Sequence, residues 1–294
     1  MNPNATPLFW TENYWSQNLK DSIENTRLTD ESGAVIYFAQ ESNNFSVPGS
    51  ATFGGWWPQG RDYSQHDYEN LLSSILTKYP HATWSFHLPP GYFYPEIFHR
   101  QEKALIQLGG TLIHETNSTI QLSMLQSGSD LSNFSRGNRK RLRAFLDRGG
   151  EIRKAQGFEL RAAHSLLVEN RARRGVKLSV DEEKFVGLLK NLPESYKCWL
   201  ALVGQEILGV AYTVEVSPHS TYVLFWGDSP AGRSVSVVAS LCARLQMIAL
   251  AEGKEFLDLG ISSEDGNVDE GLLNFKRNLG ASAFRQARIS IQSN

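Results

Sequence analysis

A short loop of small residues is the part of this chain best suited to hold an anion. Residues 228–234 read Asp-Ser-Pro-Ala-Gly-Arg-Ser, between an apolar run that ends at Gly227 and a long amphipathic helix. Gly232 lets a ligand come close to the backbone, and the N–H groups in the first turn of a helix favour a phosphate. Arg233 adds a mobile positive charge. The loop predicts a phosphate site, and a plain solvated helix start stays open because no full glycine-rich fingerprint is present.

The second residue with chemical potential is Lys276, near the end of a shorter helix. This helix is expected to begin with a capping box of Asn267 and Glu270 and to end in a left-handed cap at Gly280. Its buried face is predicted at spacings of four, three and four, and consists of Val268, Leu272, Phe275 and Leu279. Lys276 then lies at the edge of that face, where a lysine more often snorkels to the surface than takes part in catalysis. The substitution Lys276→Met is therefore expected to cost less than about 1 kcal/mol of stability.

A basic tract precedes both regions. Between residues 136 and 177, thirteen Lys or Arg residues stand against four acidic ones, in a chain whose net charge is −2. Arg136, Arg139 and Arg143 fall on one face of a helix. The residues expected to face the core are Leu142, Phe145 and Leu146. Such a basic face suits a pyrophosphate, a nucleotide-sugar or an RNA backbone, and a solvated surface is the alternative of equal weight.

The elements that must position these residues follow one another as strand, loop, helix, strand and helix over residues 221–280. The long helix has an apolar stripe of period 3.6, made of Val235, Val238, Leu241, Leu245 and Ile248. Upstream, two strand-like runs at 199–203 and 207–214 flank a turn at Gly204 and predict a hairpin. A hairpin that feeds a strand and then a helical crossover predicts a mixed α/β sheet.

Length and composition bound the protein class. At 294 residues the chain exceeds the size at which one hydrophobic core usually suffices, and its two halves repeat a similar order of elements, so two domains are expected. No window is apolar enough for a membrane span, and the start lacks the pattern of a secretory leader, which predicts a cytoplasmic protein. Cys198 and Cys242 are expected to be buried free thiols. The seven histidines show no paired spacing for a metal.

The order of elements and the motif formed by Phe275, Lys276, Leu279 and Gly280 resemble the GNAT acyltransferase superfamily. More narrowly, they resemble the branch of the Fem-type aminoacyl transferases of peptidoglycan cross-bridge synthesis and related cell-envelope acyltransferases. The basic tract at 133–143 is similar to the segment that opens the second domain in that branch. Residues 51–55, Ala-Thr-Phe-Gly-Gly, resemble a tract of its first domain. The likeness covers most of the chain and is strongest over about residues 130–285, while each motif is short.

The resemblance implies two tandem GNAT-like domains, 1–130 and 131–294. The first would lie on the acceptor side and hold no cofactor, and the second would be the acyltransferase domain. The implied reaction is N-acyl transfer from acetyl-CoA or another acyl-CoA to an amine of a cell-envelope or sugar-nucleotide precursor. A Fem-type transfer from aminoacyl-tRNA to peptidoglycan is the first alternative. A non-catalytic module that binds glycan or nucleotide-sugar is the second.

The resemblance also distributes roles among residues. In the Fem-type branch the Phe-Lys pair is associated with acyl transfer, which makes Phe275 and Lys276 catalytic candidates. Lys276 would stabilise the developing oxyanion. GNAT enzymes that use coenzyme A often carry a tyrosine in this helix as general acid, and Phe275 has no hydroxyl for that role. Asp258 is the first candidate for a general base, ahead of Asp228 and Glu264.

Binding roles complete the prediction. The donor-binding residues are expected in the loop and are Gly227, Asp228, Ala231, Gly232, Arg233 and Ser234. Substrate contacts are expected from Arg139, Arg143 and Trp226. We expect no metal, no DNA partner and no membrane span, with tRNA as an open partner and either a monomer or a homodimer as the assembly.

Overall fold

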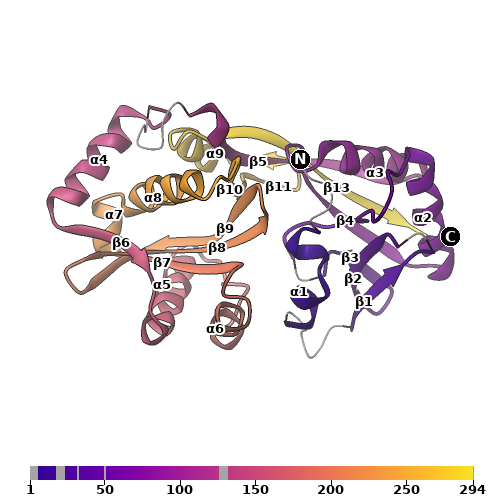
Figure 1. Cartoon of the computed structure of the whole chain (residues 1–294), viewed down its shortest axis with the longest axis horizontal. Coiled ribbons are helices and arrows are strands. Elements are labelled where there is room, and N and C mark those ends of the chain that lie inside the picture. Colours follow the sequence, from indigo (N-terminus) through magenta and orange to yellow (C-terminus); the bar gives the residue numbers. More distant parts are fainter. Residues whose placement is uncertain (1–5, 18–23, 32, 50, 126–131, 294) are drawn as a thin grey trace. The chain divides into compact units, whose positions relative to one another are not determined.

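The computed structural model describes residues 6–17, 24–31, 33–49, 51–125 and 132–293, and the chain forms two compact units (Figure 1). Unit 1 consists of residues 1–117, 261–269 and 283–294, and unit 2 of residues 118–260 and 270–282. This grouping is discontinuous, whereas the domains predicted at 1–130 and 131–294 are continuous. The difference arises because the last strand, β13 (Ser282–Gln292), pairs antiparallel with β4 (Thr83–Pro90) of unit 1.

Unit 1 is a mixed sheet with helices on it. In the sheet, β1 pairs with β2 and β2 with β3 antiparallel, and β3 pairs with β4 in parallel. These strands are β1 (Glu24–Thr29), β2 (Val35–Glu41) and β3 (Asn44–Val47). The two longer helices, α2 (Gln65–Lys78) and α3 (Pro95–Gln107), pack side by side. The N-terminal part adds η1 (Leu8–Trp10) and α1 (Glu12–Gln17). Helix α2 begins with a capping box between Ser64 and Asp67.

The glycine pair at 54–55 of unit 1 has a structural explanation. The buried side chain of Gln101, on α3, donates to the carbonyl oxygen of Trp56 at 2.7 Å and accepts from its N–H at 2.9 Å. A Cβ on Gly55 would lie 2.7 Å from Oε1 of Gln101, and the φ of Gly55 is +146°. Gly55 therefore allows α3 to hold this segment by its backbone.

The sheet strands of unit 2 follow one another in the order β10-β9-β8-β7-β6. They are β6 (Gly150–Lys154), β7 (Tyr196–Val203), β8 (Glu206–Ser217), β9 (Ser220–Asp228) and β10 (Phe256–Ile261). Strands β9 and β10 are parallel and the other neighbours are antiparallel. The predicted hairpin is confirmed as β7 and β8, with Gly204 at a φ of +60° in its turn. The predicted mixed α/β fold is also confirmed.

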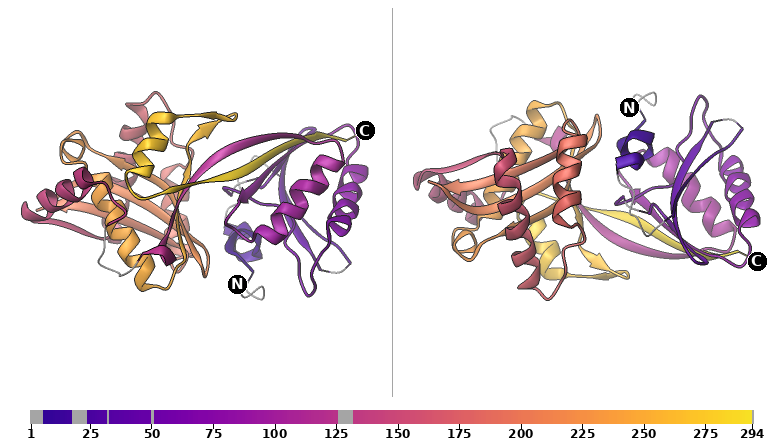
Figure 2. Two further views of the ribbon diagram at one scale, coloured as in Figure 1. Left: turned by 90° about the horizontal axis from the view of Figure 1, so that it is seen from above. Right: turned by 90° about the horizontal axis from the view of Figure 1, so that it is seen from below.

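Helices cover both faces of this sheet. Helices α4 (Arg136–Asp147) and α8 (Val237–Ala251) contact each other on one face, and α5 (Leu160–Ala172) and α6 (Glu182–Asn191) lie on the other (Figure 2). Cys198 and Cys242 are buried free thiols, as predicted, and burial raises the pKa of the Cys198 thiol to about 12. In α4, Phe145 is buried as expected, but the prediction for Leu146 is wrong, because its side chain is 54% exposed. Residue 146 follows Phe145 by one position and so points about a quarter-turn away from the core.

Candidate functional site

Lys276 lies in the buried face of α9 (Glu270–Arg277), and only 3% of its surface is exposed. Its Nζ donates a hydrogen bond of 2.9 Å to the carbonyl oxygen of Gly260. A buried ammonium is costly unless polar atoms surround it, so its position requires such partners. The prediction that Lys276 lies at the edge of the buried face is wrong.

The helix is rotated relative to the prediction. Residues 267–268 belong to β12 (Asn267–Val268), which pairs with β11 (Ser263–Glu264), and α9 begins only at Glu270. Val268 is exposed and Phe275 is 36% exposed, whereas Leu273, Lys276 and Leu279 are buried at spacings of three. The expected capping box therefore does not start this helix, because one of its two residues is in a strand.

Gly260, near the end of β10, is the residue that joins two of the predicted catalytic side chains. Its N–H donates to Oδ1 of Asp258 at 2.7 Å, and its carbonyl oxygen accepts from Lys276. The φ of Gly260 is +79°, and a Cβ there would lie 2.9 Å from the hydroxyl oxygen of Tyr222. Both the backbone conformation and the space therefore require glycine at this position.

Tyr222 is a neighbour of this centre that the sequence reasoning missed. It lies on β9 directly opposite Asp258 of β10 in the parallel register. Both residues are buried, and Asp258 has no exposed surface. Burial, followed by the negative charge of Asp258, raises the pKa of the Tyr222 phenol well above its usual range, so the phenol stays protonated. An ionisable residue within the apolar run at 222–227 was the signal available in the sequence.

The third predicted catalytic residue, Phe275, lies on the outer side of α9. Its ring packs edge-on against Trp226 of β9, with the ring centroids 6.1 Å apart. Trp226 is half-buried and was predicted to contact substrate. The pair places an aromatic surface one residue away from Lys276 along the helix.

The loop predicted to bind phosphate has a more specific structure than expected. Gly232 belongs to a separate five-residue helix, α7 (Pro230–Ser234), and the long helix α8 begins only at Val237. The N–H of Gly232 donates to Oγ of Ser229 at 3.0 Å. A Cβ on Gly232 would lie 2.0 Å from the carbonyl oxygen of Leu208 on β8. The expectation of one continuous helix that starts at Gly232 is wrong, and this glycine allows close packing on the sheet.

Asp228, at the start of this loop, ties β9 to helix α5. The side-chain amide of Asn170 donates to both its carbonyl oxygen and its Oδ1, at 3.0 and 2.8 Å. Arg233 lies 3.3 Å from the same carboxylate, and Arg173 lies 3.7 Å from it. A Cβ on Gly227 would lie 2.9 Å from Cγ of Asn170, which explains the preceding glycine. Asn170 has a position in this network that the sequence did not reveal.

The remaining loop residues, Ala231, Arg233 and Ser234, form a local hydrogen bond and reach the protein surface. Oγ of Ser234 donates to the carbonyl oxygen of Ala231 at 2.7 Å. The side chain of Arg233 is 57% exposed although it contacts Asp228. Of the six predicted loop residues, Arg233 is therefore the one that presents a charge to solvent.

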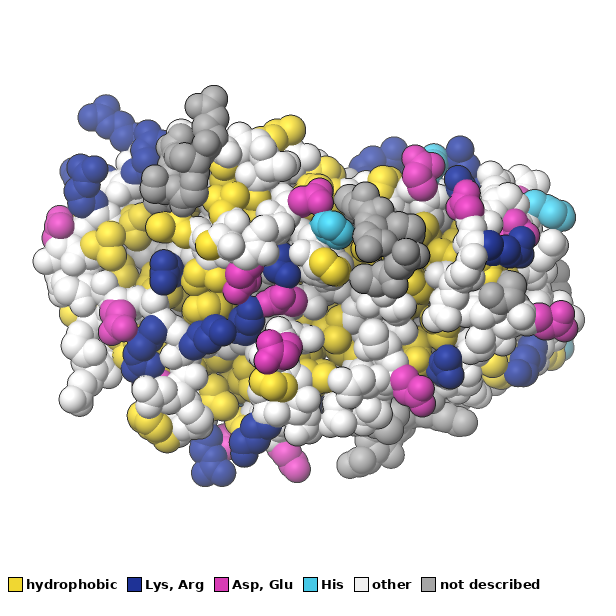
Figure 3. Space-filling view, viewed as in Figure 1, with side chains coloured by type: hydrophobic (Ala, Val, Ile, Leu, Met, Phe, Trp, Pro, Cys, Tyr) yellow, Lys and Arg dark blue, Asp and Glu magenta, His cyan; other side chains and the backbone are white. Residues whose placement is uncertain are grey.

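Helix α4 carries the predicted basic surface. Side chains of Lys and Arg gather at the upper left of Figure 3, where Figure 1 shows α4. Within the described ranges no carboxylate lies within 4.0 Å of Arg136, Lys140, Arg143 or Arg148. Arg139 differs, because its guanidinium donates to the backbone carbonyls of Phe134 and Ser132. The two predicted substrate contacts, Arg139 and Arg143, thus have different surroundings.

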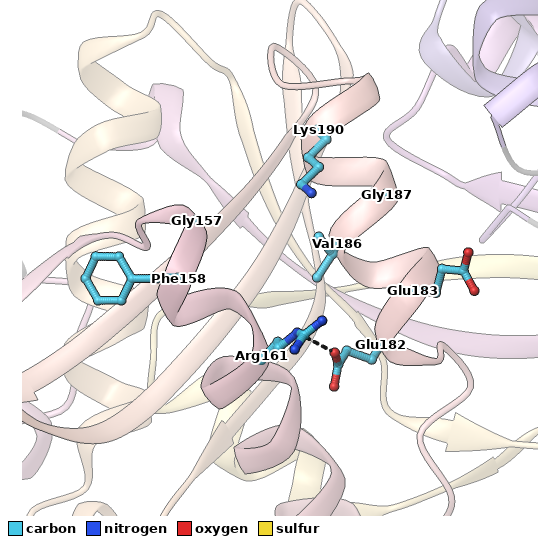
Figure 4. Close-up of a pocket in the computed structure, with 8 residues that line it drawn as sticks. All are labelled: Gly157, Phe158, Arg161, Glu182, Glu183, Val186, Gly187 and Lys190. Carbon is cyan, nitrogen blue, oxygen red and sulfur yellow. Dashed lines mark ion pairs between the residues drawn. The ribbon is translucent and has the colours of Figure 1, made fainter.

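A hollow of about 820 Å³ lies on unit 2 between the start of α5 and helix α6 (Figure 4). Arg161 and Glu182 face each other across it at 3.0 Å. Phe158 and Glu183 point away from this ion pair in the close-up. None of the predicted site residues lines the hollow, so we assign it no role in the site.

No protein-family model and no curated protein matches the chain. Solved structures do. A structure of FemX is similar with a TM-score of 0.65 at 14% identity, over 95% of this chain and 90% of that one. L-PGS from Bacillus licheniformis is similar with a TM-score of 0.62 at 12% identity, over 92% and 84%. A tandem GNAT protein from the clavulanic acid biosynthesis pathway gives 0.52 at 8% identity, over 94% and 85%.

These likenesses define the class of fold. The chain has a tandem GNAT-like architecture, with Fem-like proteins among its structural relatives. Across the described helices, none has the length and hydropathy that a membrane span requires. The described residues also contain no group of three or more His, Cys, Asp and Glu side chains arranged to hold a metal ion.

Proposed function

We propose that the protein is an N-acyltransferase that moves an acyl group from a thioester or ester donor to an amine. The observation that carries this proposal is the buried side chain of Lys276, whose Nζ lies 2.9 Å from the carbonyl oxygen of Gly260. A charge held in a desolvated position interacts more strongly with a reacting group than an exposed one. The tandem GNAT-like fold supports the same class of reaction by analogy.

In the proposed reaction the amine nitrogen attacks the acyl carbonyl carbon and forms the new C–N bond. The carbonyl oxygen becomes an oxyanion in the tetrahedral intermediate, and the C–S or C–O bond to the donor then breaks. The attacking nitrogen loses a proton, and the donor leaves as a thiol or an alcohol. Lys276 would stabilise the oxyanion by its charge, an effect worth about 3 kcal/mol when one such group is removed.

Asp258 and Tyr222 both adjoin Gly260, the residue that Lys276 contacts, and would hold it in place. Asp258 was predicted as a general base, and that role stays a prediction. Its complete burial and its hydrogen bond to the Gly260 N–H favour a positioning role, in which it fixes the residue that Lys276 contacts. The proton of the amine would then leave to another base or to water.

Coenzyme A esters are the proposed donors. The loop that contains Gly227, Asp228, Ala231, Gly232, Arg233 and Ser234 stays the proposed donor site. Because the Gly232 N–H is used by Ser229, the phosphates would be attracted by the charge of Arg233 and the first turn of α8. The pair of Phe275 and Trp226 would contact the acyl arm or the acceptor. An amine of a cell-envelope or sugar-nucleotide precursor is the proposed acceptor, on the basis of the Fem-like resemblance.

Aminoacyl-tRNA is the second candidate donor, and one observation favours it. The cations of α4 that have no carboxylate partner among the described residues form a surface suited to an RNA backbone, with Arg143 among them. A non-catalytic module with the same fold is the remaining alternative, and it would have no need for Lys276 in ligand binding.

The test begins with the purified native protein and mass spectrometry for co-purified coenzyme A or tRNA. Acetyl-CoA and charged tRNA are then added separately, and melting is followed, because a ligand that binds the native state raises the melting temperature. Transfer is measured with each donor and a set of amine acceptors. If no donor shifts melting and none supports transfer, the enzyme proposal is wrong.

A further inference from the structure

A separate pocket of about 200 Å³ lies within unit 1, and none of the candidate site residues lines it. It is formed where β4 ends, where α3 begins and where β13 passes. Its walls include the buried apolar side chains of Leu88, Phe93 and Phe98. Its polar side chains are His99 and Glu102 on α3 and Arg285 on β13, and the last two carry a full charge.

The pocket is held in shape by packing and by a backbone hydrogen bond. The rings of Phe93 and Phe98 lie 6.1 Å apart, and Trp10 stacks on Phe93 at the same separation. The N–H of Gly91 donates to the carbonyl oxygen of Arg285 at 2.8 Å. This bond fixes the backbone of Arg285 beside the turn that carries Phe93. The charged wall of the pocket is therefore held at a fixed position relative to its apolar wall.

Arg285 has an unusual partner for a guanidinium. It donates to Nε2 of His114, and within the described residues no carboxylate lies within 4.0 Å of it. Burial, followed by the charge of Arg285, lowers the pKa of His114, while Glu102 acts in the opposite direction. The imidazole therefore accepts a hydrogen bond as a neutral group and leaves the charge of Arg285 uncompensated.

Glu102 is a second charged side chain of the pocket that has no oppositely charged partner among the described residues. In the part of the chain that the structure describes, no Lys, Arg or His nitrogen lies within 4.0 Å of its carboxylate, although Arg285 lines the same pocket. One cation and one anion thus line a single apolar pocket without pairing with each other. A ligand with opposite charges a short distance apart would pair with both.

We propose that this pocket binds an α-amino acid head group, with the ligand's carboxylate on Arg285, its ammonium on Glu102 and an apolar side chain against Phe93 and Phe98. The guanidinium suits a carboxylate because it can offer two parallel N–H donors. A pocket of this volume is smaller than those that hold drug-sized ligands, and it suits a ligand part of the size of an amino acid. The proposal does not depend on acyl transfer, and it concerns binding alone.

The test is calorimetric titration of the full chain with L-phenylalanine. Phenylalanine amide lacks the carboxylate and N-acetylphenylalanine lacks the ammonium, so each should bind at least tenfold more weakly. Arg285→Gln and Glu102→Gln should each weaken L-phenylalanine at least tenfold, as expected for loss of a charge-assisted hydrogen bond. Arg285→Lys should retain part of the affinity because it keeps the charge.

Matched controls lie on the same helix. Lys103→Gln and Glu96→Gln remove one charge each from exposed positions of α3 that do not line the pocket, and they should leave binding unchanged. Melting curves establish that every variant is folded. A lysine acylated on its side-chain amine keeps the free head group. If it binds as well as L-phenylalanine, the ligand can be the amino-acid end of a larger molecule, and if it fails, the site takes free amino acids.

Three results would overturn the proposal. The first is the absence of saturable binding of both L-phenylalanine and L-leucine up to about 10 mM, a weak affinity even for a small ligand. The second is equal binding of the analogues that lack one charge. The third is equal loss of affinity in Arg285→Gln and Lys103→Gln, which would show that only the overall charge matters.

Discussion

Unit 2 has two positive regions in opposite surroundings, the buried ammonium of Lys276 and the exposed cations of α4. Lys276 has 3% of its surface exposed and donates to a backbone carbonyl, whereas residues such as Lys140 and Arg143 extend into solvent. Exposed charges are screened by salt and can be exchanged at little cost. A buried charge persists only when the surrounding structure holds it. The comparison indicates that α4 can supply attraction over a distance, and that Lys276 can supply a directed interaction at one point.

The largest effect is expected from Lys276→Met. Loss of the ammonium should lower turnover about a hundredfold or more, the scale of losing one oxyanion donor, with a smaller effect on donor binding. The expectation of a stability cost below about 1 kcal/mol rested on an exposed lysine, and burial changes it. The Gly260 carbonyl would lose its donor, which costs about 1–3 kcal/mol. Turnover, donor affinity and melting are measured on one preparation.

Two results would separate the roles of Lys276. Retained transfer in a folded Lys276→Met variant contradicts the catalytic assignment. Arg277→Met changes the neighbouring exposed cation on the same helix and serves as the control. If both variants lose activity equally, the charge of the helix matters and the buried position does not.

Gly232→Val should have the next largest effect. Its first side-chain carbon would overlap the carbonyl oxygen of Leu208, so α7 must move away from β8, at a cost of about 1–3 kcal/mol or more. Any melting shift caused by acetyl-CoA should also become smaller. Gly187→Val, in α6, is the comparison at a glycine with open space around it and no positive φ. A Gly232→Val protein with normal melting would show that the loop is not packed as described.

Gly260→Ala tests the scaffold behind Lys276. Alanine at a φ of +79° is strained, and its Cβ would press on the Tyr222 hydroxyl, so a loss of about 1–3 kcal/mol is expected. Tyr222→Phe removes the oxygen that Cβ would meet, and the pair should therefore be coupled in a double-mutant cycle. Independent effects of the two changes would contradict the contact.

The smallest effect on stability is expected from substitutions of the exposed cations of α4. Lys140→Glu together with Arg143→Glu should leave the melting temperature nearly unchanged, since neither residue has a carboxylate partner to lose among the described residues. If α4 attracts an anionic donor, affinity should fall and the loss should shrink as salt rises. Lys78→Glu, in unit 1, is the control. Equal effects of both changes would favour a merely solvated surface on α4.

The sequence allowed the fold to be predicted better than the site. The order of strand, loop, helix and strand identified the mixed sheet, because hydrophobic period and turn residues are local signals. The rotation of α9 could not be read in the same way. Asn267 and Glu270 have the pattern of a capping box, but the hairpin β11–β12 takes the first of them into a strand. Tertiary pairing thus overrode a local pattern and placed Lys276 inside.

Tyr222 and Asn170 show a second limit. Tyr222 meets Asp258 only because β9 and β10 are parallel and in this register, and Asn170 meets Asp228 across 58 residues of sequence. No local pattern distinguishes Asn170, and the apolar run around Tyr222 marks that residue without indicating its partner. Long-range contacts of this kind require the three-dimensional arrangement, whereas the resemblance of Phe275 and Lys276 to a known motif could be found from the residues alone.

The return of β13 to unit 1 has a consequence for the order in which the protein can fold during synthesis. Residues 283–294 leave the ribosome after all of unit 2, yet β13 pairs with β4, and Oγ of Ser293 bonds to the backbone at Tyr79 and Ala82. The sheet of unit 1 therefore stays incomplete, with one edge of β4 unpaired, while unit 2 is synthesised. A waiting strand edge is exposed to wrong pairing with other chains. We expect a chain released after Ser282 to be cleaved by protease within unit 1, while unit 2 is already protected.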